Sequence, residues 1–225
     1  MLRNVSLDEI SDGKLYTEND MVRVDTNSCQ GCRTVCCQNM GKTIVLDPMD
    51  VYRLTTGLSR TFEEMLGREL ELNVVDGLIM PNLKMQEKDG KCIFLQGDNR
   101  CSVHDMRPGI CRMFPLGRYW EDNTHFKYIV QKGECNKDNL SKIKLKKWLG
   151  IEGLAAYDKF VILWHQYIKQ LQSELTGLDD EQIRILNTFN LRLFYITPYA
   201  ECGDERSFYQ EFDRRVATAR EKLGL

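Results

Sequence analysis

The chain has 225 residues, with 31 Lys and Arg against 33 Asp and Glu, so its formal net charge is −2. A hydrophobic content of 42% and a charged content of 28% are typical of a folded globular protein and exclude global disorder. This charge balance argues against a dedicated nucleic-acid binder, and no run approaches the roughly 18 apolar residues of a membrane span. The first residues are polar and acidic with no apolar signal region, so we expect a cytoplasmic protein whose thiols stay reduced.

In chain order, the polar residues 1–20 predict a turn or strand that leads into a cysteine-rich loop at 29–37. The pair Asp47 and Pro48 predicts the start of a helix, because Asp is a favourable N-cap and Pro suits the first helical turn. Gly57 lies close to the expected end of this helix.

A second, short helix is expected after Ser59, with Thr61 as its cap and with Leu66 and Leu70 on one face. Residues 72–87 predict extended segments with a turn at Asp76-Gly77.

Residues 92–111 are irregular, and the runs 113–120 and 125–132 predict a hairpin. Apolar residues at helical spacing then predict helices at 140–175, 179–196 and 204–223. We therefore expect an α+β, mainly α fold. A loop-rich cysteine region at 1–138 with a short β-hairpin would pack on a helical region at 139–225, in one compact unit.

The nine cysteines are unevenly placed, because eight fall between Cys29 and Cys135 and only Cys202 lies beyond. Soft thiolate donors select Zn²⁺ or iron–sulfur clusters, so this clustering favours metal ligation over buried reduced thiols or disulfides. The predicted metal ligands are Cys29, Cys32, Cys36, Cys37, Cys92, Cys101, Cys111 and Cys135.

These eight thiols divide into two four-cysteine sites, or into one four-cysteine cluster with four accessory thiols. Neighbouring residues of an extended chain point to opposite sides, so Cys36 and Cys37 would serve different centres, or one would support the other. Four-cysteine sites fit zinc as well as iron, and the spacing leaves both metals open.

The segments CQGCRTVCC, CIFLQGDNRCSVHDMRPGICRMFP and GEC resemble the cysteine-cluster proteins of the YkgJ type, the zinc- or iron-chelating CxxCxxCC family. The resemblance covers about residues 25–137. The related flagellin lysine N-methylases are associated with a [4Fe–4S] cluster and with methyl transfer from S-adenosylmethionine. His104 stands where the family more often has Tyr. The matching residues are Cys29, Cys32, Cys36, Cys37, Cys92, Phe94, Leu95, Cys101, Arg107, Pro108, Cys111, Arg112, Phe114, Pro115 and Cys135.

Arg107 and Arg112 flank Cys111 and are the predicted cofactor-binding residues. As cationic donors they would hydrogen-bond the thiolates or sulfides of an anionic cluster and raise its reduction potential. The alternative is that they satisfy loop carbonyls and acidic partners.

Two functions of different class follow. The first is an iron–sulfur protein, with [4Fe–4S] expected, that carries electrons or presents an open iron to a small molecule, including redox or S-adenosylmethionine-linked methyl transfer. The second is a structural zinc module whose helices bind a protein partner. Whether the chain is an enzyme stays open. No GxGxxG fingerprint follows a strand, so a Rossmann-type S-adenosylmethionine site has no support in the sequence.

A basic run near Trp148 is the one feature that could suit a phosphate or nucleic acid, although a solvated helix face is the default interpretation. We expect no membrane and no nucleic-acid partner. The run comprises Lys142, Lys144, Lys146 and Lys147.

Overall fold

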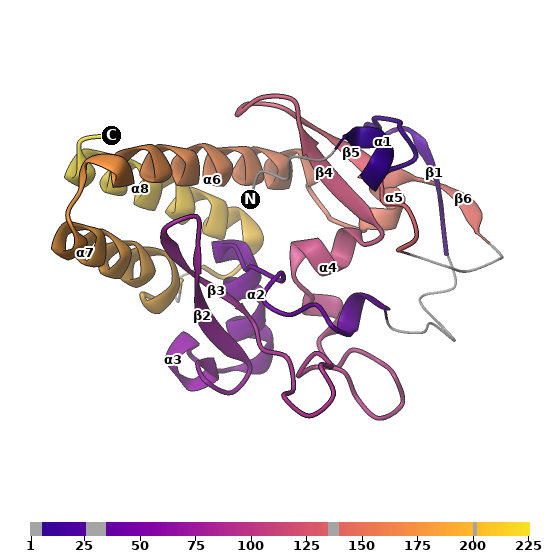
Figure 1. Ribbon diagram of the computed structural model, residues 1–225, viewed down its shortest axis with the longest axis horizontal. Helices are drawn as coiled ribbons and strands as arrows, with labels where there is room; N and C mark the ends of the chain where they lie inside the picture. Colours follow the sequence, from indigo (N-terminus) through magenta and orange to yellow (C-terminus); the bar gives the residue numbers. More distant parts are fainter. Residues whose placement is uncertain (1–5, 26–34, 135–139, 200–201) are drawn as a thin grey trace. The chain divides into compact units, whose positions relative to one another are not determined.

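The structure is a computed structural model that describes residues 6–25, 35–134, 140–199 and 202–225 (Figure 1). Contacts divide the chain into two compact units, each assembled from three separate segments. The first comprises Met1–Met40, Met85–Ser102 and Gly109–Ile162, and the second comprises Gly41–Lys84, Val103–Pro108 and Leu163–Leu225. The expected boundary after residue 138 stays a prediction.

The described residues confirm the α+β, mainly α class. Their strands form three separate two-stranded antiparallel sheets, β1–β6, β2–β3 and β4–β5 (Figure 1). The strands are β1 (Met21–Val24), β2 (Leu70–Val75), β3 (Leu78–Leu83), β4 (Leu116–Trp120), β5 (Phe126–Val130) and β6 (Ser141–Lys144). The α-helices are α1 (Leu7–Ile10), α2 (Pro48–Leu58), α3 (Phe62–Met65), α4 (Gly109–Met113), α5 (Leu145–Leu149), α6 (Leu154–Glu174), α7 (Asp180–Leu191) and α8 (Glu205–Leu223).

The first unit has a core in which the inner face of the β1–β6 sheet meets the β4–β5 hairpin and α5. Val22 and Val24 of β1 are 1% and 0% exposed, and they pack in one cluster with Leu116 of β4 and Tyr128 of β5. Backbone bridges join Ser11 to Gln131 and Tyr16 to Tyr128, so the N-terminal segment extends the hairpin. The predicted hairpin is confirmed.

The second unit is held together by aromatic residues from α6, α8 and the π-helical segment Arg192–Ile196 that follows α7. The Phe194 ring lies 5.1 Å from both Trp164 and Tyr167 of α6, and 5.9 Å from Phe212 of α8. The predicted helical stripe of α6 is therefore core, and its burial stabilises this unit.

The helix starts read from the sequence are confirmed in α2 and α3. The Asp47 carboxylate accepts a hydrogen bond from the Asp50 amide at 2.8 Å, and Asp50 reciprocates, which completes a capping box. Thr61 caps α3 in the same way. The expected helical face at Leu66 and Leu70 is wrong, because α3 ends at Met65 and Leu70 begins β2.

The turn between β2 and β3 is also where the sequence placed it. Asp76 and Gly77 have φ of 48° and 85°, the paired left-handed backbone of a two-residue hairpin. The Asp-Gly dipeptide favours this turn because Gly tolerates positive φ without steric cost.

The prediction of a continuous helix over 140–175 is wrong for the first part of this range. Ser141–Lys144 forms β6, which pairs with β1, and α5 ends at Leu149 with Gly150, at φ of 58°, as its C-cap. Gly153 has φ of 64°, so two left-handed glycines separate α5 from α6. The pairing of β6 depends on a strand near the N-terminus, which local helical spacing could not reveal.

Candidate metal centre

The predicted ligands that the structure describes all lie in segments of the first unit. They come from the 3₁₀ turn Val35–Cys37, from the irregular segment 85–102 and from α4. These ligands are Cys36, Cys37, Cys92, Cys101 and Cys111. Cys29, Cys32 and Cys135 lie outside the described residues.

Cys36 and Cys37 have their sulfurs on the same side. The two Sγ atoms are 3.7 Å apart, because Val35–Cys37 winds into a 3₁₀ turn. The expectation that the pair points to opposite sides holds only for an extended chain. With metal–sulfur bonds of about 2.3 Å, two thiolates of one tetrahedral ion lie about 3.8 Å apart, so this spacing suits a shared ion.

Backbone hydrogen bonds join the cysteine segments into an irregular ladder. The Cys92 amide donates to the Cys37 carbonyl at 2.8 Å, and Gln38 bridges Lys91 one residue further on. A second bridge joins Leu95 to Cys101. Segments that are far apart in sequence are thereby brought next to each other, so Cys37, Cys92 and Cys101 are held on neighbouring backbone.

The turn that begins at Cys92 aims a backbone donor at the sulfur. The Leu95 amide donates to the Cys92 carbonyl at 2.9 Å, which closes the turn. The Phe94 amide donates to the Cys92 sulfur and lowers the pKa of this thiol, against the burial that raises it. Burial prevails, so the pKa of Cys92 is raised overall. An amide directed at sulfur stabilises the thiolate form that a metal requires.

The pKa of Cys37 responds to the other cysteines of the first unit. Its pKa is raised far above the ordinary thiol range by the Cys36 hydrogen bond first, then by burial and by the neighbouring Cys36, Cys92 and Cys101. A raised pKa favours the neutral thiol, so a soft metal ion would be needed to bring Cys37 into the thiolate form.

The described cysteines do not form a complete site by themselves. Among the described residues, no group of three or more His, Cys, Asp or Glu side chains is arranged to hold a metal ion. The chemistry of the donors nevertheless fits a thiolate-bound metal, because the described predicted ligands are all cysteine thiols and two of their sulfurs lie 3.7 Å apart.

The two predicted arginine donors fall in different units. Arg112 belongs to the first unit with Cys111, on α4. Arg107 belongs to the second unit, where its guanidinium contacts the His104 ring. The roles of both arginines toward a cluster stay predictions.

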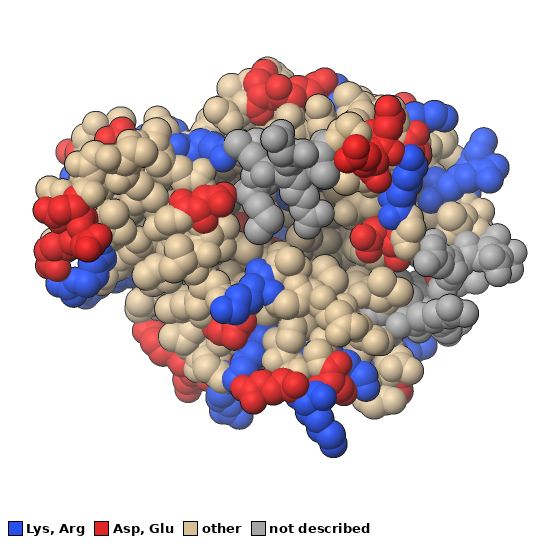
Figure 2. Space-filling model, in the orientation of Figure 1, with Lys and Arg blue, Asp and Glu red and all other residues tan. Residues whose placement is uncertain are grey.

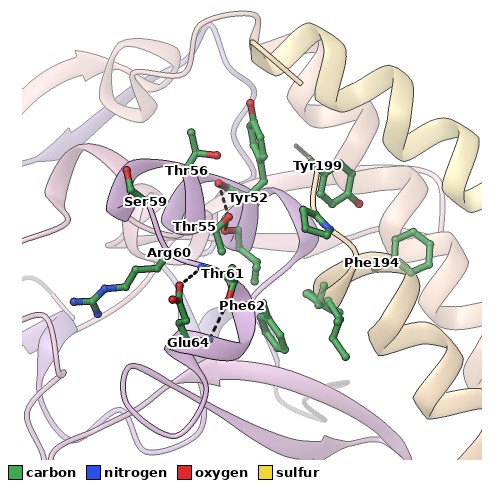
Figure 3. A pocket seen from close by; sticks show the side chains of 14 residues that line it. Tyr52, Thr55, Thr56, Ser59, Arg60, Thr61, Phe62, Glu64, Phe194 and Tyr199 are labelled. Atoms are coloured by element: carbon green, nitrogen blue, oxygen red, sulfur yellow. Dashed lines mark hydrogen bonds between the residues drawn. The ribbon is translucent and has the colours of Figure 1, made fainter. Parts of the chain in front are cut away.

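Sequence reasoning did not anticipate a cavity of about 290 Å³ in the second unit (Figure 3). It lies between α2, the start of α3 and the π-helical segment, so residues far apart in sequence form it and no local pattern could have indicated it. The Tyr52 hydroxyl donates to the Cys202 carbonyl at 3.1 Å nearby. The lining residues are Val51, Tyr52, Thr55, Thr56, Ser59, Arg60, Thr61, Phe62, Glu64, Phe194, Tyr195, Ile196, Pro198 and Tyr199, with no cysteine among them.

Comparison with protein families supplies the identity of the cysteine segment. Residues 28–136 match the CxxCxxCC family, described as "Putative zinc- or iron-chelating domain". The chain carries a CxxCxxCC domain. Its matched range contains all eight predicted ligands, so the predicted membership is confirmed and metal binding through zinc or iron is supported.

Neither the curated proteins nor the solved structures contain a match to this chain. Among the described helices, none combines the length and the apolar character that a membrane crossing requires.

Proposed function

We propose that the CxxCxxCC domain of this chain holds a [4Fe–4S] cluster through cysteine thiolates. The observation that carries the proposal is geometric: the Cys36 and Cys37 sulfurs lie 3.7 Å apart, and backbone hydrogen bonds hold the Cys92 segment beside Cys37. Thiolate sulfur is the donor that iron–sulfur clusters take, and the domain has more thiols than one cluster requires. The four ligands would come from Cys29, Cys32, Cys36, Cys37, Cys92, Cys101, Cys111 and Cys135.

When bound, such a cluster supplies one-electron chemistry and, through an iron with an open position, a site for a small molecule. The Phe94 amide would donate to the Cys92 sulfur, as it does in the structure, and thereby raise the potential of the centre. Arg112 would add positive charge beside Cys111. Redox activity and methyl transfer are the two activities that this arrangement leads us to test.

A structural zinc site is the second candidate, and one observation favours it. The 3.7 Å between the Cys36 and Cys37 sulfurs matches the edge of a tetrahedral four-thiolate ion. Two thiolates bound to different irons of a cluster would lie farther apart, because each iron takes one thiolate and these point outward. In a cluster, only one of the two cysteines would therefore be a ligand.

The two candidates are separated by metal and acid-labile sulfide analysis of the anaerobically purified full chain, with a visible spectrum. A [4Fe–4S] cluster predicts about four irons and four sulfides per chain and a brown colour. Zinc at one or two ions per chain without sulfide, in protein that stays colourless after cluster reconstitution, contradicts the cluster and establishes the zinc site.

The ligand role of the described cysteines is tested by Cys92→Ser, with Cys202→Ser as the matched control. Cys92 is buried in the ladder, whereas Cys202 lies in the second unit and outside the family match. We expect Cys92→Ser to lose most of the bound metal, and Cys202→Ser to keep the full amount. Equal metal content in both variants and the parent would remove Cys92 from the ligand set.

A further inference from the structure

The β1–β6 sheet of the first unit has one apolar face and one charged face. Val22 and Val24 point into the core, and Met21 and Arg23 alternate with them toward solvent. Antiparallel pairing sets Met21 opposite Lys144 and Arg23 opposite Lys142. Because directly opposed residues share a face, the outward positions are Met21, Arg23, Lys142 and Lys144, which we call the basic face.

The basic face carries a structural cost. Like charges directly opposite each other across two strands destabilise a sheet, and Arg23 and Lys142 are such a pair. In the described part of the chain, no ion pair joins Arg23, Lys142 or Lys144 to a carboxylate. Among the residues that the structure describes, these three cations therefore have no carboxylate partner.

The surface continues beyond the sheet. Lys146 and Lys147 of α5 are exposed directly after β6, and Lys146 donates to the Asn19 side chain at 2.9 Å. Figure 2 shows Lys and Arg side chains gathered where Figure 1 labels β1 and β6. This local excess stands out because the whole chain has a net charge of −2.

We propose that the basic face binds an acidic protein surface that has an apolar centre. Charge complementarity supplies the attraction and steers the encounter at low salt. Met21 is 49% exposed among the cations, and an apolar methionine within a charged rim is the composition of a protein interface. The four outward positions include no aromatic side chain on which a base could stack, and this disfavours single-stranded nucleic acid.

The position of the basic face relates it to the cysteines. Val24 pairs with Ser141, so the chain leaves β1 and enters β6 at the same end of the sheet. Cys29 follows β1 by five residues, and Cys135 precedes β6 by six. A partner on this face would therefore bind the two strands that adjoin the predicted ligands. The proposal stands whichever metal the cysteines hold.

The test uses the metal-loaded full chain and three labelled probes: an oligoglutamate peptide, the same peptide with one central leucine, and an oligothymidylate of equal net charge. Fluorescence anisotropy at low salt measures each dissociation constant. The variant Lys142→Gln/Lys144→Gln removes two charges from the face. Lys88→Gln/Lys222→Gln removes two exposed charges elsewhere and is the matched control.

We expect the face variant to bind both peptides about tenfold more weakly, because it lacks two of the exposed cations that attract them, and the control to bind as the parent does. Met21→Ser should weaken only the leucine peptide. Equal affinities of face variant and control, or absence of peptide binding by the parent, would overturn the proposal. Tighter binding of the oligothymidylate than of either peptide would overturn it in favour of nucleic acid. Unchanged metal content in every variant keeps these outcomes separate from the proposed function.

Discussion

At the residue scale, Asp158 shows how burial changes the behaviour of one carboxyl group. It lies on α6 in the first unit, where it accepts a hydrogen bond from the Tyr128 hydroxyl at 3.1 Å. Burial raises the pKa of Asp158, and the Tyr128 hydrogen bond and the Arg118 charge act in the opposite direction. The net shift is upward, so the folded chain holds this proton more tightly than the unfolded chain does.

This shift predicts that Asp158→Asn raises the free energy of unfolding in a pH-dependent way. The asparagine keeps a side-chain oxygen that can accept the hydrogen bond from Tyr128. The carboxyl favours folding below its unfolded pKa of 3.8, and that contribution is lost as pH rises through the raised folded pKa. The variant should therefore have a higher free energy of unfolding than the parent at pH 7, and the gain should vanish near pH 3. Urea unfolding at both pH values measures it.

Asp105→Asn is the matched control, because its side chain is fully exposed. We expect no gain from it at either pH. A gain from Asp158→Asn that is the same at both pH values would show that packing, and not the carboxyl charge, is responsible.

At the scale of the element, the N-terminus of α2 depends on one side chain. The Asp47 carboxylate satisfies the Asp50 amide, which no helical carbonyl can reach. Asp47→Ala should lower the free energy of unfolding by about 1 kcal/mol, whereas Asp47→Asn should preserve most of it. Urea unfolding measures the free energy of unfolding of both variants. Equal decreases in the two variants would show that the charge of Asp47, rather than its capping hydrogen bond, stabilises the helix.

The β1–β6 sheet gives a second prediction at this scale. Lys142→Glu would place opposite charges across from each other, because Arg23 is its register partner. The free energy of unfolding should rise by about 0.2–1 kcal/mol, while peptide binding to the basic face falls. Lys88→Glu controls for the change in net charge, and thermal unfolding measures both. An equal rise in the control would remove the cross-strand explanation.

At the scale of the whole molecule, metal binding should stabilise the two units unequally. The segments with the predicted ligands belong to the first unit, and the core of the second is aromatic. If only the folded first unit binds the metal, the free energy of binding adds to the free energy of unfolding of that unit.

The tryptophans allow each unit to be followed by its own fluorescence. Trp120 and Trp148 lie in the first unit and Trp164 lies in the second. In variants that keep one reporter, chelation should lower the unfolding midpoint of Trp148 by several degrees, and leave that of Trp164 unchanged. Equal shifts of both reporters would mean that the units unfold together.

Much of the local structure could be predicted from the chain alone. A helix cap or a tight turn depends on only a few neighbouring residues, so it can be recognised locally. This applies to Asp47, to Thr61 and to the Asp76-Gly77 turn. The predictions of secondary structure were wrong where an element pairs with a segment that is distant in the sequence. Residues 141–144 were expected at the start of a helix but form β6, because they pair with β1.

The donor chemistry of the CxxCxxCC domain follows from the amino-acid sequence alone, which supplies many soft sulfur donors and shows the family to which they belong. The folded chain was needed to show that Cys37 and Cys92 are neighbours, that the sulfurs of Cys36 and Cys37 face the same side, and that Arg23 opposes Lys142. The reason is physical. Donor chemistry belongs to each side chain, whereas the pairing of distant segments depends on loop closure and on which apolar faces can be buried together.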